Sequence, residues 1–381
     1  MQNYLKLKTA SKKKDKNLKY FVQKNVKKIL IIRFSSLGDV ILSTIFIEAL
    51  FEKYKLDKNE KNLEIFVLTK TPYDAVFANN PNIKKVFTTE SKEIFKTIKI
   101  IKKFQKEFGK IDLIFDLSFN LKSILISLFL NTKTIRISKN IIKRRILILV
   151  HSKKIKNLLK INNNFISIKQ KYSQTFLPYK INSKLYLSDK ELSFAKFSKI
   201  ANYNEQNFYI GINTSANWDT KKWIIENYIE LIQKLLKNKN KNKIVLLGGQ
   251  KEILFNKKIV EKIDFKDENF IDLTGKTTIR ELFAVVSLLN LVFTTDSAIL
   301  HISQSFNKPT LAIFGPTVSE FGFWDKGEND FLFEIQNLAC RPCSLHGTKT
   351  CPAKYSHHDC MKKIDVSDVY KKIVHFANTI F

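Results

Sequence analysis

A carboxylate that could take part in acid–base chemistry, Asp39, lies in a short polar turn near the start of the sequence. The turn contains Ser35, Ser36 and Gly38 and follows an apolar run at 29–32. Aspartate is a favoured cap at a helix start and glycine allows a tight turn, so Asp39 can be purely structural. A carboxylate at the end of a strand can instead accept a proton from an incoming hydroxyl group. The turn lacks the G-x-G-x-x-G pattern of dinucleotide sites, which favours the second interpretation.

Residues suited to a diphosphate follow another apolar run in the second half of the chain. Thr214 and Ser215 supply hydroxyl groups, Lys221 supplies an ammonium group, and a helix is predicted to begin near Trp223. Hydroxyl donors, a cation and the free N–H groups of a helix start all favour an anion. A solvated polar loop explains the same residues, and the residues alone leave both interpretations open.

A third polar cluster begins a predicted helix directly after a predicted strand. Asp296, Ser297 and Ala298 lie at this helix start, where free N–H groups can bind phosphate oxygens. The small residues at 297 and 298 let a ligand approach the backbone. Asp296 can equally be only a cap, and His301, one turn further on, is more typical of a packed helix residue than of a catalyst.

Two further polar turns occur in the same half of the sequence. Gly248 permits close approach, and the Glu252 carboxylate resembles those that accept hydrogen bonds from ribose in dinucleotide folds. Thr274 adds a polar turn on the same side. Each signal is weak by itself. Four strand ends that carry phosphate- or ribose-suited residues together predict that the C-terminal half binds a nucleotide.

All four cysteines lie near the C-terminus, at Cys340, Cys343, Cys351 and Cys360. A Cys-x2-Cys pair with two later cysteines suits tetrahedral thiolate zinc, although the later spacing is not that of a standard zinc knuckle. Structural zinc, free thiols and a disulfide remain alternatives. The arrangement is not typical of a secreted disulfide framework.

Apolar runs alternate with helical patterns along most of the chain, which is typical of βαβ units with parallel sheets. Strands are predicted at 28–33, 63–69, 111–117, 132–137, 208–213, 243–247, 291–294 and 310–314. Helices are predicted at 40–54, from about 189, and at 224–236, 252–263, 278–289, 297–306 and 366–378. Two doubly wound α/β domains that face one another across a cleft are expected, with ligands beyond the carboxyl ends of the strands. The predicted parts are a basic tail at 1–26, a domain at 27–187, and a domain at 188–381 that includes the Cys-rich segment.

The formal net charge is +31, from 66 Lys and Arg against 35 Asp and Glu. Only six of the basic residues are Arg. Lys, Asn, Ile and Phe have A/T-rich codons, so codon drift accounts for much of the charge. The scarcity of Arg and the absence of a recognisable nucleic-acid module argue against nucleic acid as a partner. No apolar run reaches the ~18–20 residues of a transmembrane helix, and residues 1–24 lack the apolar core of a secretory signal, so a cytoplasmic protein is predicted.

Taken together, these motifs resemble glycosyltransferase family 9, the ADP-heptose:lipopolysaccharide heptosyltransferases. The segment 29–42 closely matches the N-terminal signature of the family. Residues 295–301 followed by 308–317 are similar to its second signature, and the tail that starts with Cys-Arg-Pro-Cys at 340–343 is similar to that of many members. The resemblance covers 27–381.

The resemblance implies a GT-B fold of two Rossmann-like domains, with the acceptor on the N-terminal side and the nucleotide-sugar donor on the C-terminal side. It implies inversion at the anomeric centre with no cofactor required for catalysis. Asp39 would be the general base, and Lys221 would offset the charge of the departing nucleoside diphosphate. Donor-binding residues would be Thr214, Ser215, Gly248, Glu252, Thr274, Asp296, Ser297, Ala298, Ile299 and His301. Acceptor-binding residues would be Ser36, Gly38, Asn120 and Lys122.

Two departures from the family pattern bear on the donor. Ala298 stands where the second signature usually has Gly, and its methyl group would crowd the donor phosphate implied by the resemblance. Ile224 replaces the usual Pro, which removes only a favoured first-turn residue.

The predicted activity is heptose transfer from ADP-heptose to the lipid A-linked saccharide of the lipopolysaccharide inner core. The enzyme is expected on the inner face of the cytoplasmic membrane, whose anionic surface attracts a basic protein. The alternative activity uses another nucleotide sugar for surface polysaccharide or glycolipid synthesis. A nucleic-acid-binding protein and a catalytically idle scaffold are the alternatives from other classes.

Overall fold

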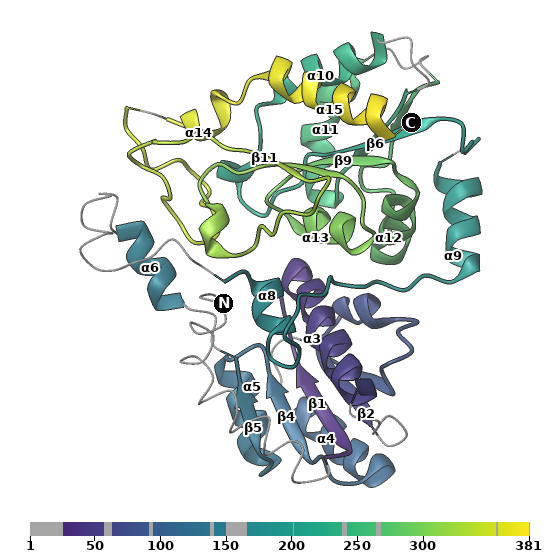
Figure 1. The fold of residues 1–381 in the computed structure, drawn as a ribbon, viewed down its shortest axis with the longest axis vertical. Helices are drawn as coiled ribbons and strands as arrows, with labels where there is room; N and C mark the ends of the chain where they lie inside the picture. Colours follow the sequence, from purple (N-terminus) through teal and green to yellow (C-terminus); the bar gives the residue numbers. More distant parts are fainter. Residues whose placement is uncertain are drawn as a thin grey trace, which may run out of the picture. The chain divides into compact units, whose positions relative to one another are not determined.

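The computed structural model describes residues 26–56, 63–90, 94–137, 141–149, 166–200, 202–237, 242–263, 268–355 and 357–380. The chain divides into two compact units (Figure 1). The first unit comprises Met1–Lys139 and Ile168–Tyr186, and the second comprises Asn140–Ser167 and Leu187–Phe381.

The first unit is built on a five-stranded parallel sheet in the order β3-β2-β1-β4-β5. Its strands are β1 (Lys28–Ile32), β2 (Glu64–Lys70), β3 (Lys85–Thr89), β4 (Leu113–Asp116) and β5 (Thr134–Arg136). Its helices are α3 (Leu37–Leu56), α4 (Ile94–Phe108), α5 (Leu121–Phe129) and α8 (Ile168–Ser173), with a 3₁₀ turn at Tyr73–Phe77. Ile29 to Ile32 are all buried, and successive strand residues point to opposite faces, so both faces of β1 are covered.

The second unit contains a six-stranded parallel sheet in the order β11-β10-β9-β6-β7-β8. Its strands are β6 (Phe208–Asn213), β7 (Asn242–Leu247), β8 (Phe270–Asp272), β9 (Leu291–Thr295), β10 (Thr310–Ile313) and β11 (Phe331–Phe333). Its helices are α6 (Ile141–Leu149), α9 (Asp189–Phe194), α10 (Ile225–Lys237), α11 (Ile253–Val260), α12 (Ile279–Leu288), α13 (Ala298–Ser305), α14 (Asp359–Lys362) and α15 (Val366–Ile380). Short 3₁₀ turns occupy Asp219–Lys221, Gln250–Glu252 and Ser319–Phe321, and a π-helical turn occupies Ala195–Lys199.

The strand order of each sheet reverses at one place, and the reversal defines where a ligand is expected. In the first unit the chain leaves β1 toward β2 on one side and reaches β4 on the other. In the second unit the corresponding neighbours are β6 and β9. Ligands of open α/β sheets bind outside the carboxyl ends of the strands at such a switch point. The predicted fold class, two doubly wound α/β units, is confirmed.

The division of the chain differs from the predicted one in the segment between residues 140 and 167. The prediction assigned this segment to the N-terminal domain, whereas its described parts, α6 (Ile141–Leu149) and residues 166–167, group with the second unit. Within that unit Leu147 packs against Val318 and Phe321, and Ser167 donates a hydrogen bond to Asp325 over 2.9 Å. The main boundary, before Leu187, lies one residue from the predicted position. The predicted basic tail, 1–26, lies outside the described residues except for Val26.

Candidate active site

Asp39 lies at the carboxyl end of β1, in the first turn of α3, at the switch point of the first sheet. Nη2 of Arg33 lies 2.6 Å from its Oδ1, and Nη1 of the same arginine donates to the carbonyl of Leu117, which follows β4, over 2.5 Å. Arg33 is completely buried, whereas the side chain of Asp39 is 24% exposed. One guanidinium group therefore orients the carboxylate against the ends of both switch-point strands.

The second carboxylate oxygen of Asp39 faces Ser36. The backbone N–H and the hydroxyl of Ser36 lie 3.4 and 3.5 Å from Oδ2, long distances for hydrogen bonds. Ser36 is the N-cap residue of α3 and Asp39 is its third helical residue. An N3 side chain that accepts from the N-cap backbone N–H is one of the two hydrogen bonds of a capping box. Asp39 is thus a helix-capping residue and also offers a weakly engaged oxygen to solvent, so the structural and chemical interpretations are compatible. Gly38 is buried beneath this turn.

The loop after β4 is arranged around the buried carboxylate of Asp116. This carboxylate accepts hydrogen bonds from the backbone N–H groups of Ser118 and Phe119 and from the hydroxyl of Ser123. Asn120 caps α5 by accepting from the N–H of Ser123 over 2.9 Å. The side-chain oxygen of Asn120, predicted to bind the acceptor, is therefore engaged in the cap, although the residue is exposed.

Lys122 lies beside the carboxyl ends of β1 and β3. Its ammonium group donates to Thr89 Oγ1 over 3.0 Å and lies 5.2 Å from the centroid of the Phe34 ring. Partial burial, and secondarily the positive charge of Lys70, lower the pKa of Lys122. Two cations that affect one another in this way make this end of the sheet attractive to an anion.

Asn213 connects the two strand ends at the switch point of the second sheet. It is the last residue of β6, completely buried, and its amide group donates to Thr294 Oγ1 over 2.9 Å and to Ser297 Oγ over 3.1 Å. The same amide donates to the carbonyl of Ser215, which also accepts from the hydroxyl of Thr295 over 2.8 Å. The predicted residues Ser215 and Ser297 are thereby brought together.

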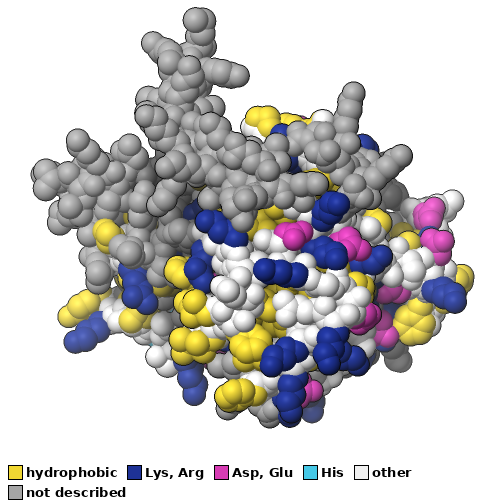
Figure 2. Space-filling view, turned by 90° about the horizontal axis from the view of Figure 1, so that it is seen from below, with side chains coloured by type: hydrophobic (Ala, Val, Ile, Leu, Met, Phe, Trp, Pro, Cys, Tyr) yellow, Lys and Arg dark blue, Asp and Glu magenta, His cyan; other side chains and the backbone are white. Residues whose placement is uncertain are grey.

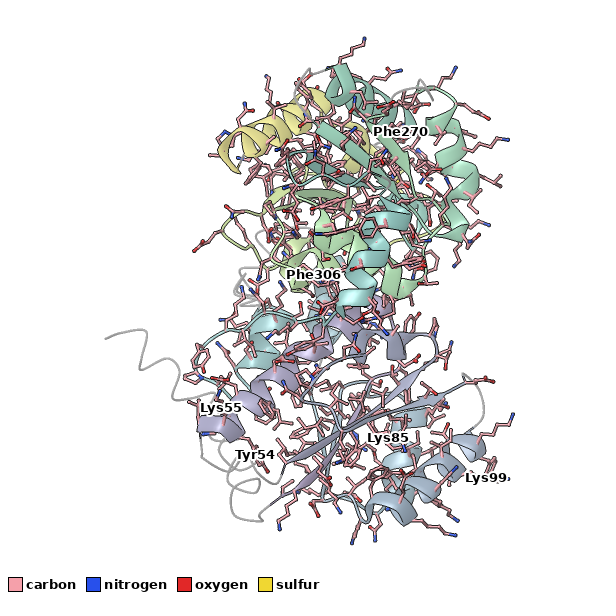
Figure 3. All side chains as sticks on the ribbon, turned by 90° about the vertical axis from the view of Figure 1, so that its right-hand side faces the viewer. Tyr54, Lys55, Lys85, Lys99, Phe270 and Phe306 are labelled. Atoms are coloured by element: carbon pink, nitrogen blue, oxygen red, sulfur yellow. The ribbon has the colours of Figure 1, made fainter. Side chains whose placement is uncertain are left out.

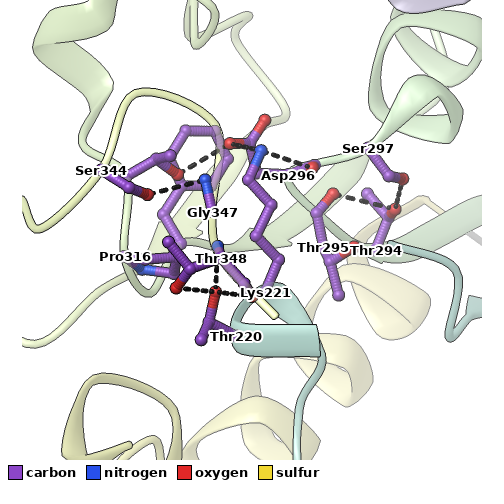
Figure 4. Close-up of polar contacts among 12 residues, drawn as sticks. Thr220, Lys221, Thr294, Thr295, Asp296, Ser297, Pro316, Ser344, Gly347 and Thr348 are labelled. Carbon is purple, nitrogen blue, oxygen red and sulfur yellow. Dashed lines mark hydrogen bonds and ion pairs between the residues drawn. The ribbon is translucent and has the colours of Figure 1, made fainter. Parts of the chain in front are cut away.

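Lys221 and Asp296 form a close ion pair at this switch point (Figure 4). Lys221 Nζ lies 2.6 Å from Asp296 Oδ2, and each side chain is 11% exposed. Thr317 donates to the same oxygen over 2.7 Å. Burial by itself raises the pKa of Asp296, but the charge of Lys221 and the hydrogen bonds from Lys221 and Thr317 outweigh it, so the pKa is lowered overall. Sequence reasoning identified Lys221 and Asp296 separately and did not predict that they pair.

The 3₁₀ turn that carries Lys221 is held by a loop of the Cys-rich segment. Thr220 Oγ1 donates to the carbonyl of Thr348 over 2.9 Å, and the N–H of Thr348 returns a hydrogen bond to that hydroxyl over 2.8 Å (Figure 4). Gly347 packs so closely that an added Cβ would lie 2.8 Å from the Cβ of Trp218. These contacts join segments 128 residues apart, so no local pattern could have indicated them.

Glu252 lies at the carboxyl end of β7. Its Oε2 accepts from the N–H of Gly249 over 3.0 Å and from the hydroxyl of Ser215 over 3.3 Å. Glu252 is 6% exposed. The predicted ribose-binding carboxylate is thus linked to the predicted diphosphate loop by a direct hydrogen bond.

Three predicted donor-binding residues pack around the side chain of Asn256 next to the β7 loop. Thr214 is completely buried, and its hydroxyl donates to Asn256 Oδ1 over 2.6 Å. Asn256 donates in turn to Thr274 Oγ1 over 2.7 Å. An added Cβ at Gly248 would lie 2.7 Å from Asn256 Nδ2, so the glycine is required by packing. Thr214, Thr274 and Gly248 thus support the β7 loop through Asn256, and their contact with the donor stays a prediction.

The start of α13 follows Asp296 at the switch point. Ser297 precedes the helix without making a side-chain cap hydrogen bond to it. The first N–H groups of an α-helix have no partner within the helix, which suits those of Ala298 and Ile299 to an anion. His301, which was predicted at the donor, is 4% exposed, and its charge contributes to the lowered pKa of Asp296.

No disulfide joins the four cysteines, which lie near enough to influence one another. Burial is the main cause that raises the pKa of Cys343 to about 11 and that of Cys360 to about 12, and the other cysteines add to both shifts. Among the described residues, however, no group of three or more His, Cys, Asp or Glu side chains has an arrangement that could hold a metal ion. Structural zinc on the four cysteines therefore stays a prediction.

Comparison with solved structures defines the class of protein. The chain superposes on E. coli ADP-heptose LPS heptosyltransferase II with a TM-score of 0.68 at 16% identity, over 92% of this chain and 98% of that one. A glycosyltransferase family 9 structure from Veillonella parvula gives a TM-score of 0.71 at 17% identity, over 92% and 97% of the two chains. The two parallel-sheet units therefore have the GT-B fold of glycosyltransferases.

Sequence comparison gives the family. Lipooligosaccharide heptosyltransferase 2 of Campylobacter jejuni is 27% identical over 350 residues, which are 91% of this chain and 98% of the relative. Lipopolysaccharide heptosyltransferase 1 of Campylobacter coli is 25% identical over 305 residues, which are 77% and 85% of the two chains. The profile of glycosyltransferase family 9 (heptosyltransferase) matches residues 101–347. The chain belongs to glycosyltransferase family 9 and is a transferase.

Proposed function

We propose that the protein transfers heptose from ADP-heptose to the lipid A-linked saccharide of the lipopolysaccharide inner core, with inversion at the anomeric carbon. The observation that carries the proposal is that each switch point holds charged side chains in a fixed position. These are the Asp39 carboxylate in the first unit and the Lys221–Asp296 ion pair in the second. The names of the Campylobacter relatives support heptose as the sugar. An E. coli heptosyltransferase with a similar fold has been solved with ADP-2-deoxy-2-fluoro heptose, which supports ADP as the carrier.

Asp39 takes the proton of the attacking hydroxyl in this mechanism. Oδ1 is held by Arg33, so the proton is accepted by Oδ2, whose contacts with Ser36 are long and easily replaced by the acceptor hydroxyl. As the hydroxyl O–H bond breaks, its oxygen forms a bond to the anomeric carbon. The bond from that carbon to the β-phosphate oxygen breaks on the opposite side, and ADP leaves with the electron pair.

Lys221 and the start of α13 stabilise the departing ADP. Negative charge grows on the diphosphate as the bond breaks, and fixed positive groups aimed at this charge lower the barrier. The ammonium group of Lys221 is held by Asp296 and by the loop that fixes Thr220, so its position is set before the donor binds. The N–H groups of Ala298 and Ile299 add a second contribution.

Glu252 and Ser215 hold the nucleoside part of the donor, and Lys122 with Ser36 holds the acceptor. Glu252 accepts a hydrogen bond from a ribose hydroxyl at the end of β7. It lies next to the Ser215 loop, which binds the diphosphate. Lys122 attracts an anionic group of the saccharide. No step is assigned to a metal ion or other cofactor, and zinc on the four cysteines would be structural.

The lipid-linked acceptor places the reaction at the cytoplasmic membrane surface in this proposal. Among the described residues, no helix is both long and apolar enough to cross a membrane. We infer peripheral attachment at the inner face, supported by the excess of basic residues.

A donor panel tests the proposal. ADP-heptose and UDP- and GDP-linked sugars are added to the purified protein during thermal unfolding, because a ligand at about 100 times its Kd stabilises the folded state by ~2.7 kcal/mol. ADP-heptose is expected to give the largest shift and, with a lipid A-linked inner-core acceptor, a product heavier by one heptose. If a different nucleotide sugar gave a larger thermal shift and a product, that sugar would be the donor and the proposal of heptose transfer would be wrong.

A further inference from the structure

The outer side of α5 exposes a stripe of large apolar residues. Leu121 is 72% exposed and Leu128 is 67% exposed, and Phe129 after them is 45% exposed. The inner side of the same helix is already filled, since Ser123 and Ile126 are buried against the sheet. Residues 121, 125, 128 and 129 recur at helical spacing, so their side chains share one face of α5. A soluble helix normally turns such a face toward the core.

Lysine residues border this stripe on the neighbouring helix α4. Lys99, Lys102 and Lys103 are exposed, whereas Ile101 and Phe104 on the other side of α4 are buried in the core. Lys102 Nζ lies 5.2 Å from the centroid of the Phe129 ring, so the basic and apolar groups adjoin. Lys99 extends outward from α4 in Figure 3. Figure 2 shows hydrophobic side chains interspersed with Lys and Arg on the face that it draws.

The nearby acidic group on α4 is already neutralised. Glu107, the acidic residue of this helix, binds Lys85 of β3 over 2.9 Å. The outer face of α4 therefore presents a positive field next to the apolar stripe. We call the combined surface the α4–α5 face and define it by Leu121, Leu128, Phe129, Lys99, Lys102 and Lys103.

An anionic bilayer complements both components of this face. Leucine and phenylalanine side chains gain free energy when they enter the boundary of the acyl chains, and lysines beside them meet lipid phosphates. A second copy of the chain is a poorer partner, because a two-fold contact would bring the same lysines against each other. Charge complementarity therefore selects the membrane over self-association.

We propose that the α4–α5 face docks the first unit on an anionic lipid bilayer. The inference rests on the proposed function, since a lipid-linked acceptor must be reached at the bilayer. Leu121 directly follows Asn120, the cap of α5, and directly precedes Lys122 at the carboxyl end of the sheet. Docking through α5 would hold the acceptor-side loop next to the lipid surface, where the saccharide is anchored.

Vesicle flotation of the full chain tests this inference without donor or acceptor. The protein is mixed with vesicles of phosphatidylglycerol and phosphatidylethanolamine, or with vesicles of phosphatidylcholine alone. Binding is expected only to the anionic vesicles. Leu128→Asp should weaken it by about tenfold or more, since one buried leucine is lost. Lys99→Gln with Lys103→Gln should weaken it by about fivefold for each lysine.

Matched changes in the second unit serve as controls. Phe197→Asp replaces a residue that is 82% exposed, and Lys257→Gln with Lys258→Gln removes two exposed lysines of α11. These variants should float like the unchanged protein, and circular dichroism verifies that every variant is folded. The proposed docking face would be overturned if the control variants lost as much vesicle binding as the α4–α5 variants. Equal binding of the unchanged protein to phosphatidylcholine and to anionic vesicles would also overturn it.

Two further readouts separate the alternatives. A dimer in analytical ultracentrifugation that Leu128→Asp dissociates would assign the face to a second copy and overturn the proposal. The donor thermal shift is measured on the same variants and should not change, because the donor residues lie in the second unit. Failure of vesicle binding with an intact donor shift would therefore reject the docking face and leave the transferase function standing.

Discussion

The guanidinium group of Arg33 and the carboxylate of Asp39 form a 2.6 Å ion pair in which the arginine is completely buried and the aspartate is partly exposed. Because Arg33 is buried, its guanidinium group is held in place and fixes the direction of the Asp39 carboxylate. Its other amino group is bound to the carbonyl of Leu117, which leaves little freedom for the pair to rotate. This relationship makes Asp39 a preorganised proton acceptor in the proposed mechanism.

Asp39→Asn should lower turnover by about 10²–10⁴-fold, the usual range for loss of a general base. The amide has nearly the same shape but accepts a proton poorly. Initial rates of heptose transfer are the measurement, and ADP-heptose affinity should be unchanged. Asp74→Asn, in the 3₁₀ turn of the same unit, is the control. Turnover near that of the unchanged protein would remove Asp39 from the role of base.

Arg33→Lys should lower kcat by up to about 10²-fold through misplacement of Asp39. An ammonium group keeps the charge but cannot hold both the carboxylate and the Leu117 carbonyl in one plane. Circular dichroism and the KM for the donor are measured beside kcat, because misplacement of Asp39 lowers kcat in protein that is still folded and still binds the donor. An unchanged kcat would show that Arg33 contributes only to folding.

Lys221→Met should reduce both donor affinity and kcat and should destabilise the second unit by about 3–5 kcal/mol. The stability loss arises because Asp296 would remain buried without its cation. Adding Asp296→Asn should restore much of the stability in urea unfolding but not the activity. Recovery of activity in the double variant would contradict the proposed contact of Lys221 with the diphosphate.

Glu191 gives a stability prediction that depends on pH. Hydrogen bonds from Arg280 are the main cause that lowers the pKa of Glu191 to about 2, against an ordinary value of 4.5. Because the folded-state pKa is depressed, the stabilisation is complete above the unfolded-state pKa and is lost as pH falls from about 4.5 to about 2. Glu191→Gln should therefore lower the unfolding free energy by about 1–3 kcal/mol at pH 7, after allowance for solvent screening of a partly exposed pair.

The measurement for Glu191 is urea unfolding at several pH values. The difference between Glu191→Gln and the unchanged protein should shrink steadily below pH 4.5. Arg280→Gln should lower the unfolding free energy by a similar amount and with the same pH dependence. The double variant should lose little more unfolding free energy than either single variant. A difference that persists unchanged at the lowest pH would exclude the ion pair as its source.

Gly347→Ala should loosen the turn that carries Lys221. The added Cβ would lie 2.8 Å from the Cβ of Trp218 and 3.2 Å from the Cγ of Lys221, and Gly347 has a φ of +96°, which is unfavourable for alanine. We expect a loss of about 1–3 kcal/mol in stability and a higher KM for the donor. Lys349→Ala, an exposed change in the same loop, should leave both unchanged.

The polar loops at the strand ends could be predicted from the sequence because they depend on local patterns. Each buried strand reads as an apolar run, and each functional loop follows such a run directly, as Ser36 to Asp39 follow β1. Three of the four edge strands, β3, β8 and β11, were not predicted; they are three to five residues long and only partly buried. Short edge strands leave little periodicity to detect.

The partners of the site residues could not be predicted, because they come from distant segments. In the sequence, Arg33 only marks the end of a predicted strand. Its contact with the Asp39 carboxylate is known only from the structure. The hydroxyls of Thr214 and Ser215 look alike in a sequence, but the first donates to the buried Asn256 and the second donates to Glu252. A charged residue directly after an apolar run, such as Arg33, is the one signal that could have indicated the buried pair.

The assignment of α6 to the second unit has a consequence for chimaeric enzymes. The chain enters the second unit at Asn140, returns to the first at Ile168 and leaves it again after Tyr186. A hybrid made by joining two family members once, near residue 187, would leave Leu147 of one parent to pack on Val318 and Phe321 of the other. Donor-side units should therefore be exchanged as two segments together, and hybrids with a single junction should express less soluble protein than those with matched segments.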